Sequence, residues 1–281
     1  MNVHRAITDL RAALRSVQLA DREVAFVPTK GALHEGHLSL VHRARAVADV
    51  VVLSIFVNPL QFGPGEDLER YPRDERRDLE LAAEAGVDFV FLPSVDEMYG
   101  RDADTTVSVG SLGEVVEGAA RPGHFDGVAT VVVKLFNIVQ PTYALFGQKD
   151  AQQVAVIKKV VADLSLAVEV VVCPTFRDPD GLALSSRNVY LDATQRGAAT
   201  ALNEALRAGT VVLQETDSTE GAEKVMRDLL TERGFDVDYA TVVDPDTFLA
   251  PEPDADRLLV IAAQIGATRL IDNVLVGRKR G

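Results

Sequence analysis

The feature that most constrains the fold is a series of short runs that are mostly apolar and rich in β-branched residues. These runs lie at 23–28, 50–57, 87–92, 143–146 and 167–173. Residues with helical spacing fill the segments between them, at 37–48, 73–85, about 125–139 and 150–164. Strands that are apolar on both faces are typical of a parallel sheet covered by helices on both sides. Right-handed crossovers then predict an α/β fold, a Rossmann-like doubly wound parallel sheet.

The character of the chain changes after Cys173. The segment "PTFRDPDGLALSSRN" is rich in turn formers and polar residues. Helical patterns then cover 192–208 and 220–233, and strand-like runs cover 236–243, 257–263 and 269–276. We therefore predict a Rossmann-like N-terminal domain at 1–173 and a smaller α+β domain at 174–281 that is hinged on it as a lid.

Composition excludes several classes of function. The chain has 29 Lys and Arg against 42 Asp and Glu, a net charge of −13, which argues against nucleic acid as a partner. Cys173 is the single cysteine, so no disulfide can form within the chain, and we expect a cytoplasmic protein. No apolar run approaches the ~18 residues of a membrane span. The first residues, "MNVHRAITDLRAALRSV", predict an amphipathic helix rather than a secretory signal.

The strongest local motif is the segment "PTKGALHEGH", where a predicted strand meets a helix. A helix N-terminus favours phosphate, and Gly31 and Gly36 let a ligand approach the backbone. His34 and His37 lie three apart, so their rings can converge and donate N–H groups to a phosphoryl oxygen. The alternative is one capping histidine and one surface histidine. A zinc site is a weaker alternative, because no other histidine or cysteine cluster supplies the remaining ligands.

Two further segments carry polar groups beyond predicted strands. "FGQKDAQQ" offers Lys149 for a phosphate, and amides in the first turn of the next helix, Gln152 among them, for a polar substrate. "LSSRN" offers two hydroxyls and a guanidinium. Taken alone, the first is a common turn and the second a common helix cap. We expect "GPGED" at 63–67 to be a flexible loop, and Asp74, Asp78 and the acids at 66–69 to form a solvated face.

Together with "SIFVNPLQFGPGEDLERYPRD" and "GHFDGVATVVVKLFNIVQP", these segments occur in one order between about 23 and 191. In this order they resemble the pantoate–β-alanine ligase (pantothenate synthetase) family. That family is similar in turn to the class I aminoacyl-tRNA synthetases and nucleotidyltransferases, whose H-x-G-H motif binds ATP. The resemblance implies that pantoate attacks the α-phosphate of ATP and that β-alanine then captures the pantoyl adenylate, with release of pyrophosphate and AMP.

The resemblance also implies the residues of the site. The residues expected to act in catalysis are His37, His34, Lys149, Ser185, Ser186 and Arg187. The residues expected to bind ATP are Lys30, Gly31, Ala32, Leu33, His34, Glu35, Gly36, His37, Gly147, Gln148, Lys149, Asp150, Phe176, Leu184, Ser185, Ser186 and Arg187. The residues expected to bind pantoate or β-alanine are Gln61, Gln153, Asn58, Arg121 and His124. Mg²⁺ is expected to arrive with ATP, without a dedicated protein metal site, and the family implies a homodimer formed through the N-terminal domain.

Lys30 departs from the family pattern, which usually has methionine there. The side chain could face solvent, pair with Glu35 or contact the phosphates, or it could mark altered acid specificity. Because a buried ammonium is costly without a partner, we expect Lys30 to turn toward solvent or Glu35 in the free enzyme and to be able to reach the phosphates or the pantoate carboxylate when substrates bind. We also expect Lys30→Met to speed adenylate formation, because a nearby cation weakens a carboxylate nucleophile.

Overall fold

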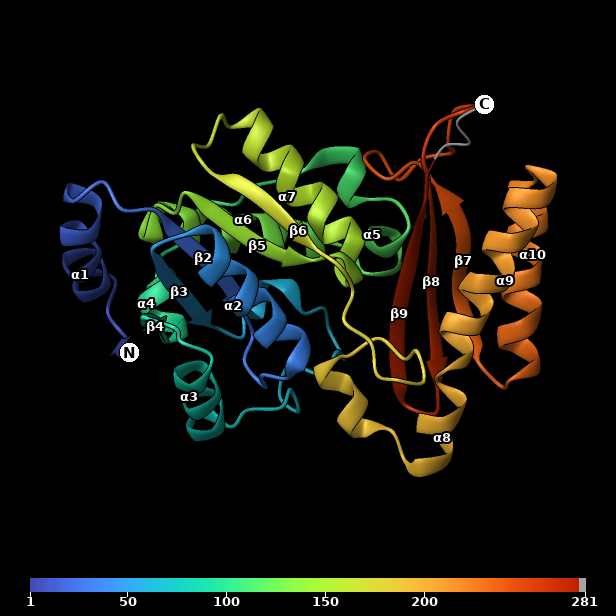
Figure 1. Ribbon diagram of the computed structural model, residues 1–281, viewed down its shortest axis with the longest axis horizontal. Coiled ribbons are helices and arrows are strands. Elements are labelled where there is room, and N and C mark those ends of the chain that lie inside the picture. The colour runs from blue at the N-terminus through green and yellow to red at the C-terminus, as the bar shows by residue number, and fades with distance from the viewer. Residues whose placement is uncertain (278–281) are drawn as a thin grey trace.

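The computed structural model describes residues 1–277. Its N-terminal part contains six parallel strands in the order β1-β4-β3-β2-β5-β6 (Figure 1). The strands are β1 Asn2–His4, β2 Val24–Thr29, β3 Val50–Ile55, β4 Phe89–Phe91, β5 Tyr143–Gly147 and β6 Glu169–Cys173. The order reverses direction at β2, the position at which doubly wound sheets bind their ligands.

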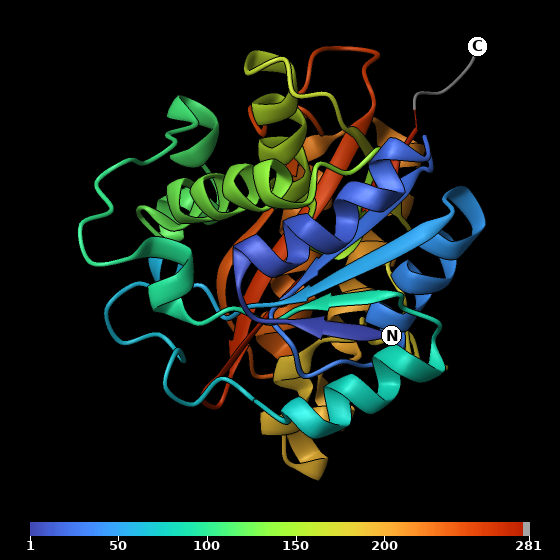
Figure 2. The same cartoon turned by 90° about the vertical axis from the view of Figure 1, so that its left-hand side faces the viewer.

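Helices cover both faces of this sheet (Figure 2). The helices of this part are α1 Ile7–Leu19, α2 Glu35–Val47, α3 Glu75–Glu84, α4 Val95–Tyr99, α5 Glu117–Ala120, α6 His124–Val139 and α7 Ala151–Asp163. Alternate residues of a strand point to opposite faces. Phe26 of β2 packs in the cluster that contains residues of α1, α6 and α7, whereas Val27 packs with α2 and α3. Both faces are therefore buried, as the apolar runs predicted.

The C-terminal part is an antiparallel sheet with helices on one face. Its strands, in the order β7-β8-β9, are β7 Asp236–Val243, β8 Arg257–Ile265 and β9 Thr268–Val276. Its helices are α8 Ala193–Ala198, α9 Ala201–Thr216 and α10 Thr219–Glu232. Leu206 and Met226, from α9 and α10, pack against Leu259 and Ile261 of β8.

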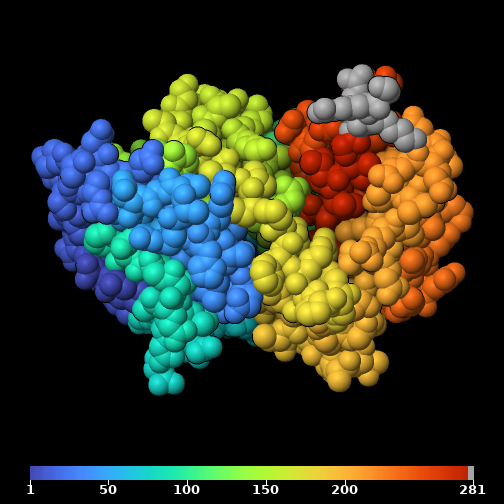
Figure 3. All heavy atoms as spheres, in the orientation of Figure 1, coloured from blue at the N-terminus to red at the C-terminus, as the bar shows by residue number. Residues whose placement is uncertain are grey.

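The other face of this sheet packs on the N-terminal part. Phe125 and Val156, from α6 and α7, share one apolar cluster with Val243, Leu258 and Val260. In Figure 3 the N-terminal part (blue to green) and the C-terminal part (orange to red) meet along the middle of the molecule, with the segment that joins them in yellow between. The two parts therefore share buried apolar surface as well as a connecting chain.

The predicted fold class is confirmed, and two details are wrong. The first residues are not helical, because Asn2–His4 pair with β4 as an edge strand and helix α1 begins only at Ile7. The helix expected at 192–208 is two helices, α8 and α9, and the second continues to Thr216. The domain boundary at 173 stays a prediction, and the last four residues of the predicted second domain lie outside the described part. None of the helices in residues 1–277 is long and apolar enough to span a bilayer.

Candidate active site

The turn between β2 and α2 is held in an unusual backbone conformation. Gly31 and Ala32 both have positive φ, at 82° and 50°. A Cβ on Gly31 would lie 2.8 Å from a carboxylate oxygen of Asp78, so glycine is required there. The buried Asp78 carboxylate accepts hydrogen bonds from the N–H groups of Ala32 and Leu33, at 2.9 and 2.7 Å. Strained backbone persists only where its surroundings fix it, and Asp78 provides that constraint from α3.

This turn delivers both histidines to one place. His34 is the N-cap of α2, and its Nδ1 accepts a hydrogen bond from the Gly36 N–H at 3.2 Å. The His37 ring lies 4.1 Å from the His34 ring, centroid to centroid, and its buried Nδ1 has no hydrogen-bond partner within residues 1–277. Burial, followed by nearby positive groups, lowers the pKa of His34 to about 4 and of His37 to about 3. Both imidazoles are therefore neutral at pH 7.

The second element of the site follows β5. The short 3-10 helix η3, Gln148–Asp150, presents Lys149 and Asp150 beside the histidines, and Gln153 follows in α7. Burial alone would raise the pKa of Asp150, but the charges of Lys149, Lys30 and Arg187 lower it, so the carboxylate is ionised. Its charge partly balances the surrounding cations.

The third element is the 3-10 helix η4, Ser186–Tyr190, with Ser185 as its N-cap. The Ser186 hydroxyl donates a hydrogen bond to the Ala32 carbonyl at 3.3 Å, which ties this segment to the strained turn. The Arg187 guanidinium donates to both carboxylate oxygens of Asp67, at 2.8 and 2.7 Å. Arg187 also lies over the Tyr71 ring. Asp67 thus fixes the orientation of the guanidinium, and its carboxylate occupies the position that an anionic ligand could take.

These three elements enclose two adjoining cavities. The smaller, about 180 Å³, is lined by His34, His37, Gln61 and Ser186 and by an apolar wall from α6. The larger, about 1040 Å³, extends between the N-terminal part and the strands of the C-terminal sheet. Residues that line both cavities are Lys30, Lys149, Asp150, Gln153, Ser185 and Arg187. The boundary between the cavities therefore carries three cations beside one carboxylate.

Comparison with known proteins identifies the family. A family model described as "Pantoate-beta-alanine ligase" matches residues 2–275. The chain belongs to the pantoate–β-alanine ligase family. The enzyme is 54% identical to the pantothenate synthetase of Gluconobacter oxydans over 278 residues, which cover 98% of this chain and 99% of the relative. It is 51% identical to that of Acetivibrio thermocellus over 279 residues, with the same coverage of each chain.

Solved structures agree with this assignment. The crystal structure of pantothenate synthetase from Thermus thermophilus has a TM-score of 0.92 and 48% identity, and the match covers 98% of this chain and 99% of that one. The pantoate–β-alanine ligase of Francisella tularensis, described as complexed with β-γ ATP and β-alanine, has a TM-score of 0.82 and 34% identity, with 98% and 97% covered. The matches confirm the fold, the family and the assignment of the enzyme as a ligase.

Most of the residues predicted to bind ATP line the cavities. Those that do are Lys30, His34, Gly36, His37, Gly147, Lys149, Asp150, Phe176, Leu184, Ser185, Ser186 and Arg187. Gly31, Ala32 and Leu33 form the strained turn instead, and Glu35 is exposed. Gln148 contacts Asn273 of β9, with its side chain donating to the Asn273 amide oxygen at 3.3 Å. The roles of all these residues toward ligands stay predictions.

The residues predicted to bind pantoate or β-alanine also line the cavities, but they differ in how their polar groups are used. The Gln153 amide has no hydrogen-bond partner among residues 1–277, so it is available to a ligand. Asn58 is fully engaged: its amide donates to Gln61 and to the Gly127 carbonyl, and its oxygen accepts from Leu60 and Tyr99. Asn58 therefore positions Gln61. Gln152, which we expected to face a substrate, is buried and bonds to the backbone around α5.

Arg121 and His124 are likewise committed to the protein. Arg121 donates to Glu66 at 2.8 and 2.5 Å and to the Gln61 carbonyl at 3.2 Å. His124 lies 2.7 Å from the same carbonyl through Nδ1 and 3.1 Å from Arg121 through Nε2. This geometry fits a neutral ring protonated on Nδ1, and burial lowers the pKa of His124 to about 4.

Three further expectations from the sequence are wrong. Lys30 faces neither solvent nor Glu35, because its ammonium lies over the Tyr71 ring, 5.5 Å from the centroid, within the cavity wall. Asp78 is buried rather than solvated, because it binds the backbone of the strained turn. Glu66 and Asp67 are ion-paired to Arg121 and Arg187, so the loop at 63–67 is anchored across the cavity.

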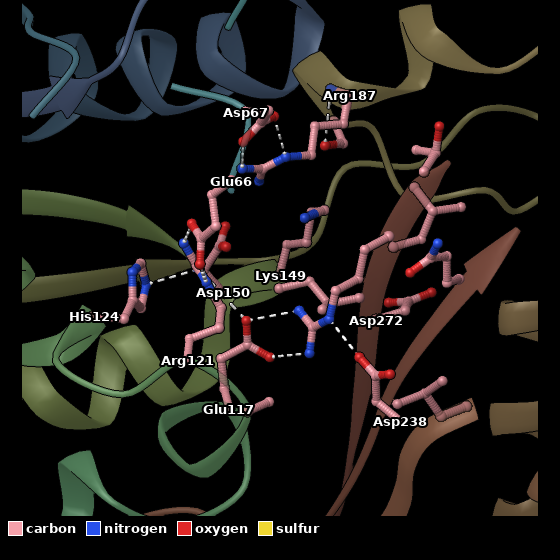
Figure 4. Close-up of a pocket in the computed structure, with 18 of the residues that line it drawn as sticks. Glu66, Asp67, Glu117, Arg121, His124, Lys149, Asp150, Arg187, Asp238 and Asp272 are labelled. Carbon is pink, nitrogen blue, oxygen red and sulfur yellow. Dashed lines mark hydrogen bonds and ion pairs between the residues drawn. The ribbon is translucent and has the colours of Figure 1, made fainter. Parts of the chain in front are cut away.

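No sequence pattern indicated the chain of ion pairs at the far side of the larger cavity. Buried Glu117 accepts two hydrogen bonds from Arg269 of β9, each at 2.8 Å, and one from the Tyr239 hydroxyl at 2.9 Å. Arg269 also pairs with Asp238 of β7. Figure 4 shows Glu117 and Arg121 on the N-terminal side, facing Asp238 and Asp272 on the strands opposite. The partners of Glu117 on the second sheet lie 122 and 152 positions away in sequence, beyond any local pattern.

Proposed function

We propose that the enzyme condenses pantoate with β-alanine at the expense of ATP, through a pantoyl-adenylate intermediate. The observation that carries this proposal is the pair of neutral histidines at the N-terminus of α2, which faces Lys149 and the Ser185–Arg187 segment across one cavity. A helix N-terminus, neutral N–H donors and cations together fit the triphosphate of a nucleotide. Family membership supports the same reaction.

The smaller cavity fits a branched hydroxy acid. Its wall from α6 presents Val128, Val131 and Leu135, which suit the two methyl groups of pantoate. Gln61 and Gln153 face the same space and can pair with the hydroxyl groups and the carboxylate. Buried amides discriminate against acids that lack those hydroxyls, since an unpaired amide is costly.

The chemistry takes two steps. A carboxylate oxygen of pantoate attacks the α-phosphorus, the bond from that phosphorus to the bridging oxygen breaks, and pyrophosphate leaves. The neutral amine of β-alanine then attacks the carbonyl carbon, the carbon–oxygen bond to AMP breaks, and the nitrogen releases a proton as the amide forms. ATP is needed because AMP is a good leaving group, whereas a bare carboxylate has none.

The protein stabilises the charge that gathers on the phosphate during attack. His34 and His37 donate N–H groups as neutral rings, so they need no proton from solvent at pH 7. Lys149 supplies a positive charge, and Ser185, Ser186 and Arg187 add donors from the facing segment. Such preorganised donors act most strongly where charge develops in the transition state.

Mg²⁺ belongs to this proposal as part of the ATP substrate. Within residues 1–277 no group of three or more His, Cys, Asp or Glu side chains is arranged to hold a metal ion. Asp150 offers an ionised carboxylate that faces the cavity without a hydrogen-bond partner in the same part of the chain. Carboxylates bind Mg²⁺ directly or through its waters, so Asp150 is the residue we assign to meet the magnesium of bound ATP.

We propose that the enzyme works in the cytoplasm as a homodimer, with small-molecule substrates and no nucleic-acid or membrane partner. The acidic composition and the single buried cysteine support this setting. Light scattering coupled to size-exclusion chromatography distinguishes a dimer from a monomer of 30.3 kDa.

The decisive experiment is exchange of labelled pyrophosphate into ATP, with and without pantoate. We expect exchange that requires pantoate but not β-alanine, and trapping of labelled pantoyl adenylate when the amine is omitted. Exchange that proceeds equally without pantoate would contradict the proposal. A stable nucleotidyl product in place of AMP and an amide would indicate a nucleotidyltransferase instead.

A further inference from the structure

Lys30 occupies the boundary between the two cavities. It follows β2 directly, and it lines both the smaller and the larger cavity. Its ammonium lies over the face of Tyr71, 5.5 Å from the ring centroid. The ammonium makes no hydrogen bond or ion pair with the side chains or backbone of residues 1–277. A cation on an aromatic face is attracted to the ring, but its three N–H donors still need acceptors.

Three of the four arginines that line the cavities differ from Lys30 in this respect. Arg121, Arg187 and Arg269 each bind carboxylates of the protein. Lys30 and Lys149 have no carboxylate within ion-pair distance in the part of the chain that the structure describes. The charges of these three arginines are therefore largely neutralised before substrate binds, whereas the two lysine charges, like that of the exposed Arg70, are available to an anion.

We propose that Lys30 is a catalytic residue of this enzyme, whose ammonium binds the pantoate carboxylate and an α-phosphate oxygen together and so holds the two reacting groups in contact. The inference rests on the proposed function. Adenylate formation must bring two anions within bonding distance, and a cation between them offsets their repulsion. Lys30 stands with Lys149 and Arg187 at the boundary between the two cavities, beside the one that fits the acid.

The charges around Lys30 support this assignment. Burial, and then the Arg187 charge, lower the pKa of Lys30 to about 8, Asp150 opposes them, and Arg121 and Lys149 lower it further. Asp67, His37 and His124 also face it closely enough for its charge to affect their own pKa. At pH 7 Lys30 of the free enzyme is therefore protonated, but its ammonium loses the proton more readily than that of an ordinary lysine. Bound phosphates add negative charge and hold that proton more firmly.

This geometry predicts that Lys30→Met changes the rate of adenylate formation in the direction opposite to the one expected from the sequence. No acceptor of the described residues holds this ammonium away from the ligands. It can therefore stabilise the charge that builds on the phosphate as well as the attacking carboxylate. We therefore expect Lys30→Met to slow adenylate formation by about tenfold or more and to weaken pantoate binding. A tenfold change in rate corresponds to about 1.4 kcal/mol of barrier.

The chain offers a matched control in Lys134. Its ammonium lies over the Tyr99 ring at 5.6 Å, a similar contact, but it lines neither cavity. Single-turnover formation of labelled pantoyl adenylate is measured in the wild type, Lys30→Met and Lys134→Met, with melting temperatures for all three. Slow turnover in Lys30→Met alone supports the proposal. Turnover of Lys30→Met within twofold of the wild type overturns it, and equal slowing of Lys134→Met points to lost packing and overturns it too.

A binding measurement separates charge from structure. ATP affinity is measured by calorimetry at pH 7 and pH 9 in the wild type and Lys30→Met. The wild type should bind ATP more weakly at pH 9, because Lys30 must then take up a proton on binding, and Lys30→Met should lose that pH dependence. An unchanged pH dependence in Lys30→Met contradicts the proposal. A wild type that forms no adenylate refutes the proposed function instead, since that result appears before any variant is compared.

Discussion

The two walls of the candidate active site are built in different ways. The N-terminal wall, from β2 to α2, is fixed by backbone: a strained turn, a buried carboxylate on its N–H groups and two neutral histidines. The C-terminal wall is held to the N-terminal part by polar side chains, chiefly through Glu117, which binds Arg269 and the Tyr239 hydroxyl. Backbone fixation suits the wall that needs exact placement of donors. Ion pairs, unlike a strained turn, can re-form after they are broken.

The largest effect should come from the neutral donors of the first wall. His37→Ala should lower the rate of adenylate formation by roughly 10²–10³-fold, the range for losing one donor to a developing anion. Stability should change little, because His37 Nδ1 bonds to nothing in residues 1–277. His34→Ala should match it in rate but lose some stability as well, since His34 caps α2.

The control for this prediction is His42→Ala, an exposed histidine on the same helix. Single-turnover kinetics and chemical denaturation of the three variants give both readouts. Full activity in His37→Ala would remove that ring from the mechanism and with it the distinction between the two walls.

The second effect should come from the ion pairs. Glu117→Gln should lower the free energy of unfolding by about 3 kcal/mol, because it removes the charge from a buried carboxylate that binds two arginines. Exposed Glu114, three residues earlier and without an ion pair in the described part, provides the control Glu114→Gln. Urea denaturation measures both. Equal stability of the two variants would show that the C-terminal wall is held by apolar packing alone.

The third effect should come from the carboxylate that holds the strained turn between β2 and α2. Asp78→Asn should cost about 2 kcal/mol, because an amide in place of the carboxylate loses at least one of the two charge-assisted bonds to buried N–H groups. Asp74→Asn, at the N-cap of the same helix, should cost little, since asparagine caps a helix as well as aspartate. If Asp78→Asn also slows adenylate formation while Asp74→Asn does not, the turn positions the histidines. Unchanged kinetics would show that the histidines need no such support.

The smallest effect should be confined to the acid substrate. Gln153→Ala should raise the KM for pantoate by roughly tenfold, about 1.4 kcal/mol, since it removes a hydrogen-bonding amide from the smaller cavity. ATP affinity in the same variant is the internal control and should stay within about twofold. Loss of ATP affinity with unchanged pantoate affinity would mean that the two subsites have been exchanged.

The sequence predicted the first wall far better than the second. Strand periodicity and the H-x-G-H spacing are local signals, and they placed His34 and His37 together at the end of β2, as the structure confirms. The sequence does not reveal that Asp78 is buried. A buried acid whose partners are backbone N–H groups 45 residues away looks the same in sequence as a surface acid. Glu117 and Arg269 meet only because the second sheet folds back on the first, which no local pattern reports.

The apolar cluster shared by the two parts couples their folding, although the chain is built from two sheets. Phe125 and Val156 of the first part are buried against Leu258 and Val260 of the second. A fragment ending at the predicted boundary, 173, would present that surface to water and invite aggregation. The two parts should accordingly lose structure together, in one calorimetric transition, because this cluster is complete only when both are folded. Newly synthesised chain would likewise depend on β8 before the apolar surface of α6 and α7 is covered.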